Sequence, residues 1–381
     1  MKIVLVKGIS QYGSMRNYID QWEHYCRKMG HVTYVYDAMT DRLLEHLESV
    51  FVEMQPDLVL SCNAIYAESI EGILPEGCRY CTVLYDNPVV HLERLSCLGD
   101  RSIVFSCDRF YAEFIQEHYP EIHKVGFLPL SGNCTKHQVP YRQRGISLLF
   151  TGTYFDLNQH YAAIKQLPET MQIMAENVMD IMLQEPDMLL WQALDQTLSD
   201  NDVDMQPNVR MQILSILRCV DIFVRAYVRD QVMLHIVDAG IPVHIYGNGW
   251  ERFRCSQPKN LILHQGDGEV SLQALANTKI SLNVMPWFRG GIQERNVAAM
   301  LSGAVSLTDS SRYIEQHFTD DVDIKLYSLK QLDQIPLLIQ ALLENDDTAA
   351  EIAMRGQQKA LAGHTWEHRV ADMLQQITEE P

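Results

Sequence analysis

The chain has 381 residues, with 31 Lys or Arg against 49 Asp or Glu, so its formal net charge is −18. At roughly 150 residues per domain, this length predicts about two domains. A hydrophobic content of 47% beside a charged content of 21% is typical of a globular protein and excludes a low-complexity chain. The acidic balance argues against a broad interface with nucleic acid or an anionic membrane, because both need a basic face. An anionic small ligand must therefore be held by a few local donors.

The N-terminal residues MKIVLVKGIS predict a first β-strand and no signal peptide, because the apolar run ends at Lys7 and no small-residue cleavage site follows. No stretch approaches about 18 uncharged apolar residues, so no transmembrane helix is predicted. The nine cysteines have irregular spacing and predict reduced thiols in a cytoplasmic protein. The single CxxC, formed by Cys78 and Cys81, has no second pair at zinc spacing, so we expect small core residues and no metal.

Short apolar runs alternate with helical periodicity through the first 140 residues. Strands are predicted over residues 3–6, 32–36, 58–60, 80–84, 103–105 and 125–128. Runs of about five apolar residues separated by amphipathic helices predict a parallel sheet covered on both faces. The polar stretch 132–145, which contains Pro140, predicts a domain boundary near residue 140.

The same pattern restarts after this boundary. A helical region is predicted from about residue 160 to 198, followed by a long helix that ends at Gly240, and a last helix is predicted over 366–377. Strands are predicted over residues 146–150, 243–246, 261–263, 280–284, 304–307 and 324–327. The chain therefore predicts two doubly wound α/β units, in which ligands bind outside the carboxyl ends of the strands. With two facing units, the expected site is the cleft between them.

Four predicted strands of the second half are followed by glycine-bearing loops, at residues 150–154, 245–250, 264–268 and 287–295. In such loops backbone N–H groups can approach a phosphate or a sugar without interference from a Cβ atom. A single loop of this kind is common in any α/β protein. Four of them at one edge of a sheet indicate a ligand site.

The fourth loop is the most specific. Gly290 and Gly291 precede a predicted helix, and the positive end of that helix, together with Arg289 and Arg295, can cradle a diphosphate. Glu294 is placed to accept hydrogen bonds from ribose or sugar hydroxyls. The alternative for Arg295 is a surface ion pair with a neighbouring carboxylate.

A longer resemblance includes this loop. The segment GGIQERNVAAMLSGAVSLTDSS, followed by IEQHF, LYSLKQL and GHTWEHRV, resembles the C-terminal domain of CgeB-like glycosyltransferases, which are bacterial GT-B enzymes related to the group-one glycosyltransferases. IPVHIYGNGW matches that group's strand-and-glycine signature, and LYDNP resembles its Asp-x-Pro segment. The similarity covers most of residues 141–381 and is looser over 1–140.

The resemblance implies a GT-B fold, with two facing Rossmann-like domains and a cleft between them. It implies an acceptor-side domain at residues 1–140, a donor-side domain at 141–363 and a C-terminal helix at 364–381 that crosses back onto the first domain. Carried over by position, it assigns the donor nucleotide-sugar to Gly152, Thr153, Tyr246, Gly247, Gly249, Gly290, Gly291 and Arg295.

One position departs from the family's pattern. The family usually has a Glu that holds the ribose five residues before the helix-ending Gly, and counting back from Gly303 gives Ala298. Either Glu294 replaces that carboxylate from the preceding turn, or donor binding is altered or lost.

Candidate acid–base residues follow the strand at 80–84, at its carboxyl end. Asp86 can deprotonate an acceptor hydroxyl, with His91 beside it, although Asp86 is equally well explained as the cap of the turn before Pro88. Two Asp-x-Asp pairs, at 202–204 and 321–323, are better explained as acidic turn residues than as metal ligands.

These features predict a cytoplasmic glycosyltransferase of hexosyltransferase type. It moves a sugar from a nucleotide-diphosphate donor to a hydroxyl of a saccharide, protein or other acceptor, with no metal and no other cofactor. Its work is to position two substrates and to stabilise the leaving diphosphate. Two alternatives stay open: a nucleotide-sugar epimerase on the same architecture, and a GT-B-shaped binding protein that has lost catalysis.

Overall fold

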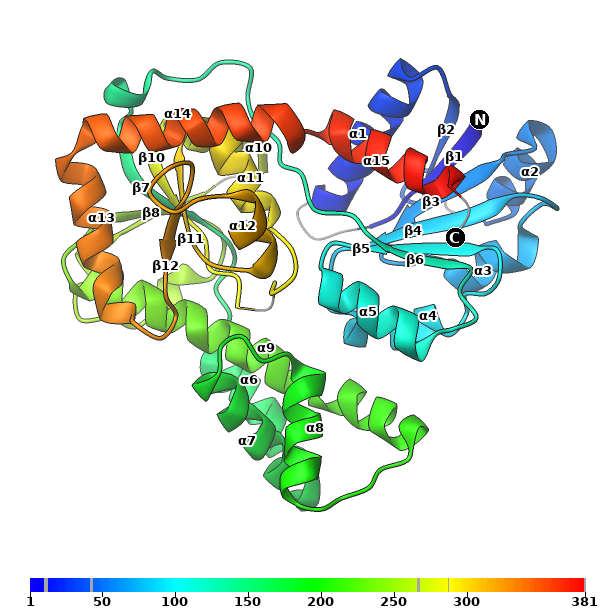
Figure 1. Cartoon of the computed structure of the whole chain (residues 1–381), viewed down its shortest axis with the longest axis horizontal. Helices are drawn as coiled ribbons and strands as arrows, with labels where there is room; N and C mark the ends of the chain where they lie inside the picture. The colour runs from blue at the N-terminus through cyan, green and yellow to red at the C-terminus, as the bar shows by residue number, and fades with distance from the viewer. Residues whose placement is uncertain (10–12, 42–43, 266–267, 287, 380–381) are drawn as a thin grey trace. The chain divides into compact units, whose positions relative to one another are not determined.

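The computed structural model describes residues 1–9, 13–41, 44–265, 268–286 and 288–379. The chain forms two compact units, drawn in Figure 1. Unit 1 comprises Met1–Ser131, Gly290–Ile292 and Ala362–Pro381, and unit 2 comprises Gly132–Arg289 and Gln293–Leu361. The chain first passes from unit 1 to unit 2 between Ser131 and Gly132, at the start of the polar stretch 132–145. Within the described ranges, no helix combines the length and the apolar character that a membrane span requires.

Unit 1 contains a six-stranded parallel sheet in the order β2-β1-β3-β4-β5-β6. Its elements are β1 (Lys2–Lys7), α1 (Ser14–Lys28), β2 (Val32–Asp37), α2 (Leu44–Met54), β3 (Leu58–Cys62), α3 (Ala67–Ile73), β4 (Arg79–Leu84), α4 (Leu92–Leu95), β5 (Ser102–Ser106), α5 (Arg109–His118), β6 (Lys124–Phe127) and α15 (Trp366–Thr378). Every residue of β3 and β5 is buried, as expected for central strands of a parallel sheet covered on both faces. All six strands predicted in this half are confirmed.

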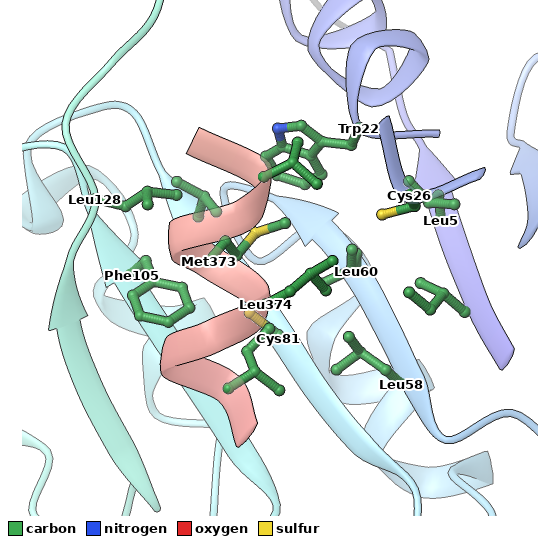
Figure 2. Packing of buried hydrophobic residues seen from close by; sticks show 14 of the residues in the cluster. Leu5, Trp22, Cys26, Leu58, Leu60, Cys81, Phe105, Leu128, Met373 and Leu374 are labelled. Atoms are coloured by element: carbon green, nitrogen blue, oxygen red, sulfur yellow. The ribbon is translucent and has the colours of Figure 1, made fainter. Parts of the chain in front are cut away.

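The C-terminal helix α15 completes the core of unit 1. Its apolar residues recur at helical spacing, so they form one face that turns toward the sheet. Met373 and Leu374 pack in one cluster with Leu58, Leu60 and Phe105 of the strands, as Figure 2 shows. The predicted return of the final helix onto the N-terminal domain is therefore confirmed.

Unit 2 contains a second six-stranded parallel sheet, in the order β12-β11-β10-β7-β8-β9. Its elements are β7 (Ile146–Thr151), α6 (Leu157–Lys165), α7 (Glu169–Gln184), α8 (Leu190–Asp200), α9 (Pro207–Asp238), β8 (Val243–Tyr246), β9 (Leu261–His264), α10 (Gly268–Leu275), β10 (Thr278–Leu282), α11 (Glu294–Leu301), β11 (Val305–Asp309), α12 (Arg312–His317), β12 (Lys325–Tyr327), α13 (Ile335–Glu344) and α14 (Asp346–Gly363). The predicted doubly wound architecture is confirmed in both units.

A helical segment from α6 to α9 is inserted between β7 and β8 (Figure 1). The helical region predicted over 160–198 consists of three helices, because Pro168 and Pro186 interrupt it and proline cannot donate an intrahelical hydrogen bond. The long helix α9 begins at Pro207 and spans 32 residues, and Gly240 follows it with a φ of 87°. This insertion brings Arg229, in the second half of α9, to the loop that follows β7.

Candidate functional site

The loops that follow β7 and β8 pack directly on each other at the carboxyl edge of the unit 2 sheet. The backbone N–H of Gly152 donates to the carbonyl of Tyr246 at 2.9 Å, and that of Tyr154 donates to the carbonyl of Asn248 at 2.9 Å. The indole N–H of Trp250 donates to the carbonyl of Gly152 at 2.7 Å. The two loops therefore form one rigid structure.

Close approach of these loops requires glycine. A Cβ atom on Gly247 would lie 2.0 Å from the carbonyl oxygen of Gly152, which no real side chain tolerates. Gly249 has a φ of 89°, in the region that favours glycine. The structure thus brings together Gly152, Thr153, Tyr246, Gly247 and Gly249, the residues predicted for the nucleotide side of the donor. The ring of Tyr246 is also stacked on that of His264, with centroids 4.5 Å apart.

Two arginines reach the β7 loop from two different helices. Arg295, in the first turn of α11, donates to the carbonyl of Thr151 at 2.8 Å and to Oδ1 of Asn283 at 2.9 Å. Arg229, in the second half of α9, is 6% exposed and donates to the carbonyl of Thr153 at 2.9 Å. The two guanidinium carbons lie 5.9 and 5.7 Å from the centroid of the Phe150 ring. Both cations therefore flank one loop.

The electrostatics of this pair favour an anion. Burial is the main reason that the pKa of Arg229 is lowered, and the like charges of Arg295 and Arg225 lower it further. The neighbouring carboxyl of Asp230 is also buried, and burial raises its pKa to about 7. This neighbour is therefore largely neutral below pH 7. An anion at the loop would relieve the repulsion between the two guanidinium groups.

Arg289, predicted to bind a diphosphate with Arg295, instead belongs to a buried ion pair. Its Nη2 lies 3.3 Å from Oδ2 of Asp309, and these two side chains are 6% and 2% exposed. Its Nε and Nη1 donate to the carbonyls of Pro286 and Ser310. A buried carboxylate needs such a partner, because an uncompensated charge in the interior is costly. Arg289 thus stabilises unit 2.

Gly290 and Gly291 also differ from their predicted place. The helix α11 begins at Glu294, so these glycines do not form its start. Gly290 donates its N–H to Oδ2 of Asp108 at 2.7 Å, and a Cβ atom on Gly291 would lie 2.1 Å from the carbonyl of Cys107. Both glycines contact the end of β5, within unit 1, and do not form the helix start. That they face a diphosphate stays a prediction.

Ala298, at the position where the family usually has a Glu, packs among apolar side chains. Ala298 is 5% exposed and belongs to an apolar cluster with Ile146, Leu149 and Ala299. A Glu at 298 would bury its carboxylate among these apolar side chains. Glu294 lies one helical turn earlier, and residues four apart share a face of a helix. The only carboxylate that this face of α11 carries within its first two turns is that of Glu294.

In unit 1, Asp86 and His91 lie together beyond the carboxyl end of β4. The Asp86 side chain is 53% exposed, whereas that of His91 is 5% exposed, and His91 Nε2 lies 3.7 Å from Asp86 Oδ2. The turn that follows is capped by Asn87, whose Oδ1 accepts from the N–H of Val89 at 3.1 Å. Asn87 is thus the cap of this turn, and the carboxylate of Asp86 is the accessible member of the pair.

The Asp-x-Asp pairs are turn residues, as expected. Asp202 and Asp321 have φ values of 51° and 59°, and Asp321 and Asp323 form ion pairs with Lys325 and Lys359. Across the described ranges, no group of three or more His, Cys, Asp or Glu side chains is arranged to hold a metal ion.

Sequence reasoning missed Arg229 and Asn63. The available signal for Arg229 was a charge inside the apolar second half of α9, between Val228 and Val232. Asn63 lies at the end of β3 and donates to Asp86, and nothing in the local sequence marks it.

Comparison with known proteins relates this geometry to a family. Residues 227–375 match the family described as glycosyl transferase-like. No curated protein matches the sequence. Among solved structures, the chain is similar to an alpha-glucosyltransferase in complex with UDP and a 13-mer DNA (9% identity, 100% of each chain covered, TM-score 0.59).

Two further structures extend this similarity. One is Anabaena HepE in complex with UDP, with 9% identity, 99% of this chain and 100% of the other covered, and a TM-score of 0.56. The other is sucrose-phosphate synthase from Thermosynechococcus elongatus, with 10% identity, 99% and 98% covered, and a TM-score of 0.55. The chain thus has the GT-B fold of glycosyltransferases, and its residues 227–375 correspond to a glycosyl transferase-like family.

Proposed function

We propose that the protein transfers a sugar, of hexose type, from a nucleotide-diphosphate donor to an acceptor hydroxyl. The observation that carries the proposal is the convergence of Arg229 and Arg295 on the glycine loop after β7. In a chain of charge −18, two guanidinium groups at one loop form a local site for an anion. Guanidinium groups are well suited to phosphate oxygens, because their N–H donors are arranged as a planar fork.

The chemistry explains why such a site would serve transfer. As the bond between the sugar C1 and the diphosphate oxygen breaks, negative charge grows on the leaving diphosphate. Arg229 and Arg295 would stabilise that charge without a metal ion, and Glu294 would accept a hydrogen bond from the ribose. Structures with the same fold contain UDP, so a uridine diphosphate donor is the first to test.

On the acceptor side, we assign the base to Asp86. The acceptor oxygen forms a bond to C1, its proton passes to the carboxylate of Asp86, and the nucleoside diphosphate departs with the electrons of the broken bond. His91 lies behind Asp86 and is too buried to meet the acceptor itself. A saccharide or protein hydroxyl suits this site better than DNA, because the chain's charge opposes a polyanion. The nine free thiols fit the reducing conditions of the cytoplasm.

Donor binding tests the proposal directly. Calorimetry and thermal shift with UDP, UDP-glucose and other nucleotide-sugars are expected to show binding, since a ligand that binds only the folded state raises its stability. Arg229→Lys is expected to weaken UDP binding about tenfold, because the planar fork is lost while the charge remains. Arg355→Ala, which removes an exposed cation on α14, is the control and is expected to bind UDP normally. Normal UDP affinity in Arg229→Lys and Arg295→Lys would overturn the assignment.

The remaining alternatives are separated by the products. Conversion of the donor to an epimer with no released UDP would establish the epimerase. An absence of binding across the whole panel would favour the inactive binding protein. Activity that disappears with EDTA and returns with Mg²⁺ would refute metal independence.

A further inference from the structure

The loop after β3 has an unusual backbone. Asn63, Ala64 and Tyr66 have φ values of 53°, 48° and 56°, in a left-handed region that few residues other than glycine adopt. Contacts from neighbouring elements hold this loop: the N–H of Ala64 donates to Oγ1 of Thr82 at 2.8 Å, and Nη1 of Arg94 donates to the carbonyl of Asn63 at 2.9 Å. A strained backbone persists only where its surroundings define it this closely, and such sites cluster at functional positions.

The strained conformation sends the Asn63 side chain toward Asp86. Oδ1 of Asn63 accepts from the N–H of Tyr85 at 2.8 Å, and its Nδ2 donates to Oδ2 of Asp86 at 2.8 Å. Asn63 itself is 5% exposed. One buried amide thus binds the backbone before Asp86 and the carboxylate of Asp86 at the same time.

His91 also lies near this carboxylate oxygen. Its Nε2 is buried, lies 3.7 Å from Oδ2 of Asp86, and has no hydrogen-bond partner among the residues that the structure describes. A buried polar nitrogen without a partner is rare, so its direction toward this carboxylate calls for an explanation. Among the described residues, the thiol of Cys107 also lies near Asp86: burial is the main reason that its pKa is raised, and the charges of Asp108 and Asp86 raise it further. Arg94 contacts the same loop through the carbonyl of Asn63.

We propose that Asn63 is a positioning residue that fixes the carboxylate of Asp86 beyond the end of β4, with the buried His91 as the second support. This inference rests on the proposed function, in which Asp86 accepts the proton of the acceptor hydroxyl. Asn63 does not meet the substrate. It holds one oxygen of Asp86 with a neutral donor, so that an exposed side chain keeps one orientation.

The first test needs no activity and no folded variant of Asn63. In NMR spectra of the full chain, the side-chain amide resonances of Asn63 are expected to shift with pH as Asp86 titrates, and to stop shifting in Asp86→Asn. The side-chain amide of Asn201, which donates to the carbonyl of Thr197, is the control and is expected to stay constant. If the side-chain amide resonances of Asn63 do not change as Asp86 titrates, the proposal is overturned.

The second test uses the rate of UDP release from UDP-glucose, with water as the acceptor. Asn63→Asp keeps an oxygen for the N–H of Tyr85 and tolerates a positive φ, but it sets a like charge against Asp86. The acidic limb of the pH–rate profile is expected to move up by about one pH unit, which is a tenfold loss of rate on that limb. Ser96→Asp, an added charge at an exposed position of the same unit, is expected to leave the profile in place.

The two tests separate two kinds of failure. An unmoved acidic limb in Asn63→Asp would contradict the positioning role. A normal rate in Asp86→Asn, together with an Asn63 amide that follows Asp86 in the unaltered protein, would leave the positioning correct and refute Asp86 as the base.

Discussion

An Asp230→Asn substitution is expected to stabilise the protein at pH 8, with a gain that disappears as the pH approaches 4. Asp230 is 6% exposed, and burial raises its pKa from 3.8 to about 7, although the neighbouring Arg229 acts in the opposite direction. Between these two pH values the folded chain binds more protons at this site than the unfolded chain. The free energy of unfolding therefore falls as the pH rises from about 4 to about 7, and it stays low above that range.

The magnitude follows from the size of the shift. Each pKa unit corresponds to about 1.4 kcal/mol, so a shift of about three units sets an upper bound of about 4 kcal/mol. Relaxation around the charged form and partial access of water reduce the cost, and we expect about 2 kcal/mol at pH 8. Asn has nearly the same shape as Asp and carries no charge, so it removes this cost at high pH only.

Urea unfolding at pH 4.5, 6 and 8, followed by tryptophan fluorescence, measures the effect as a change in the transition midpoint. Asp180→Asn is the matched control, because it makes the same change of charge at an exposed position of α7. A gain of equal size at all three pH values, or a gain shared by Asp180→Asn, would show that burial of charge at Asp230 is not the cause.

Three further substitutions test contacts inside one unit or the other. Gly247→Ala is expected to displace the carbonyl of Gly152 and to destabilise the chain by about 1–3 kcal/mol. It is also expected to weaken UDP binding at least tenfold, and an unchanged affinity in calorimetry would contradict this. Met373→Ala, at a fully buried position of α15, is expected to cost about 2–5 kcal/mol in urea unfolding, and a loss below 1 kcal/mol would mean that α15 is not part of the core. Arg289→Met leaves the carboxylate of Asp309 buried without its cation, so a loss of about 3–5 kcal/mol is expected at pH 8, and a stable variant would show that the pair is dispensable.

The amino-acid sequence by itself determined the fold class and the order of its elements. Short apolar runs bounded by glycine and proline predicted every strand of both sheets, because a strand covered on both faces must be apolar along its whole length. The helical spacing of the apolar residues in α15 likewise predicted a face that needs a partner. Such patterns are local, so they can be recognised without knowing what the segment packs against.

The site depended on contacts that only the tertiary structure decided. Gly290 and Gly291 suggest a helix start when they are considered locally, but Asp108, far away in the sequence, accepts the N–H of Gly290. Arg289 was expected at a ligand, yet the burial of Asp309 requires it as a counter-charge. The second arginine at the β7 loop is Arg229, which a long inserted helix supplies.

The physical reason is the same in each case. Whether a charged or flexible residue meets a ligand or a neighbouring residue depends on which buried partner lies within hydrogen-bond distance, and that is set by how distant segments pack. Asn63 is an example, because its role follows from a 2.8 Å hydrogen bond to Asp86. The two residues follow β3 and β4, which pair in the sheet but which the sequence predicts only as separate strands.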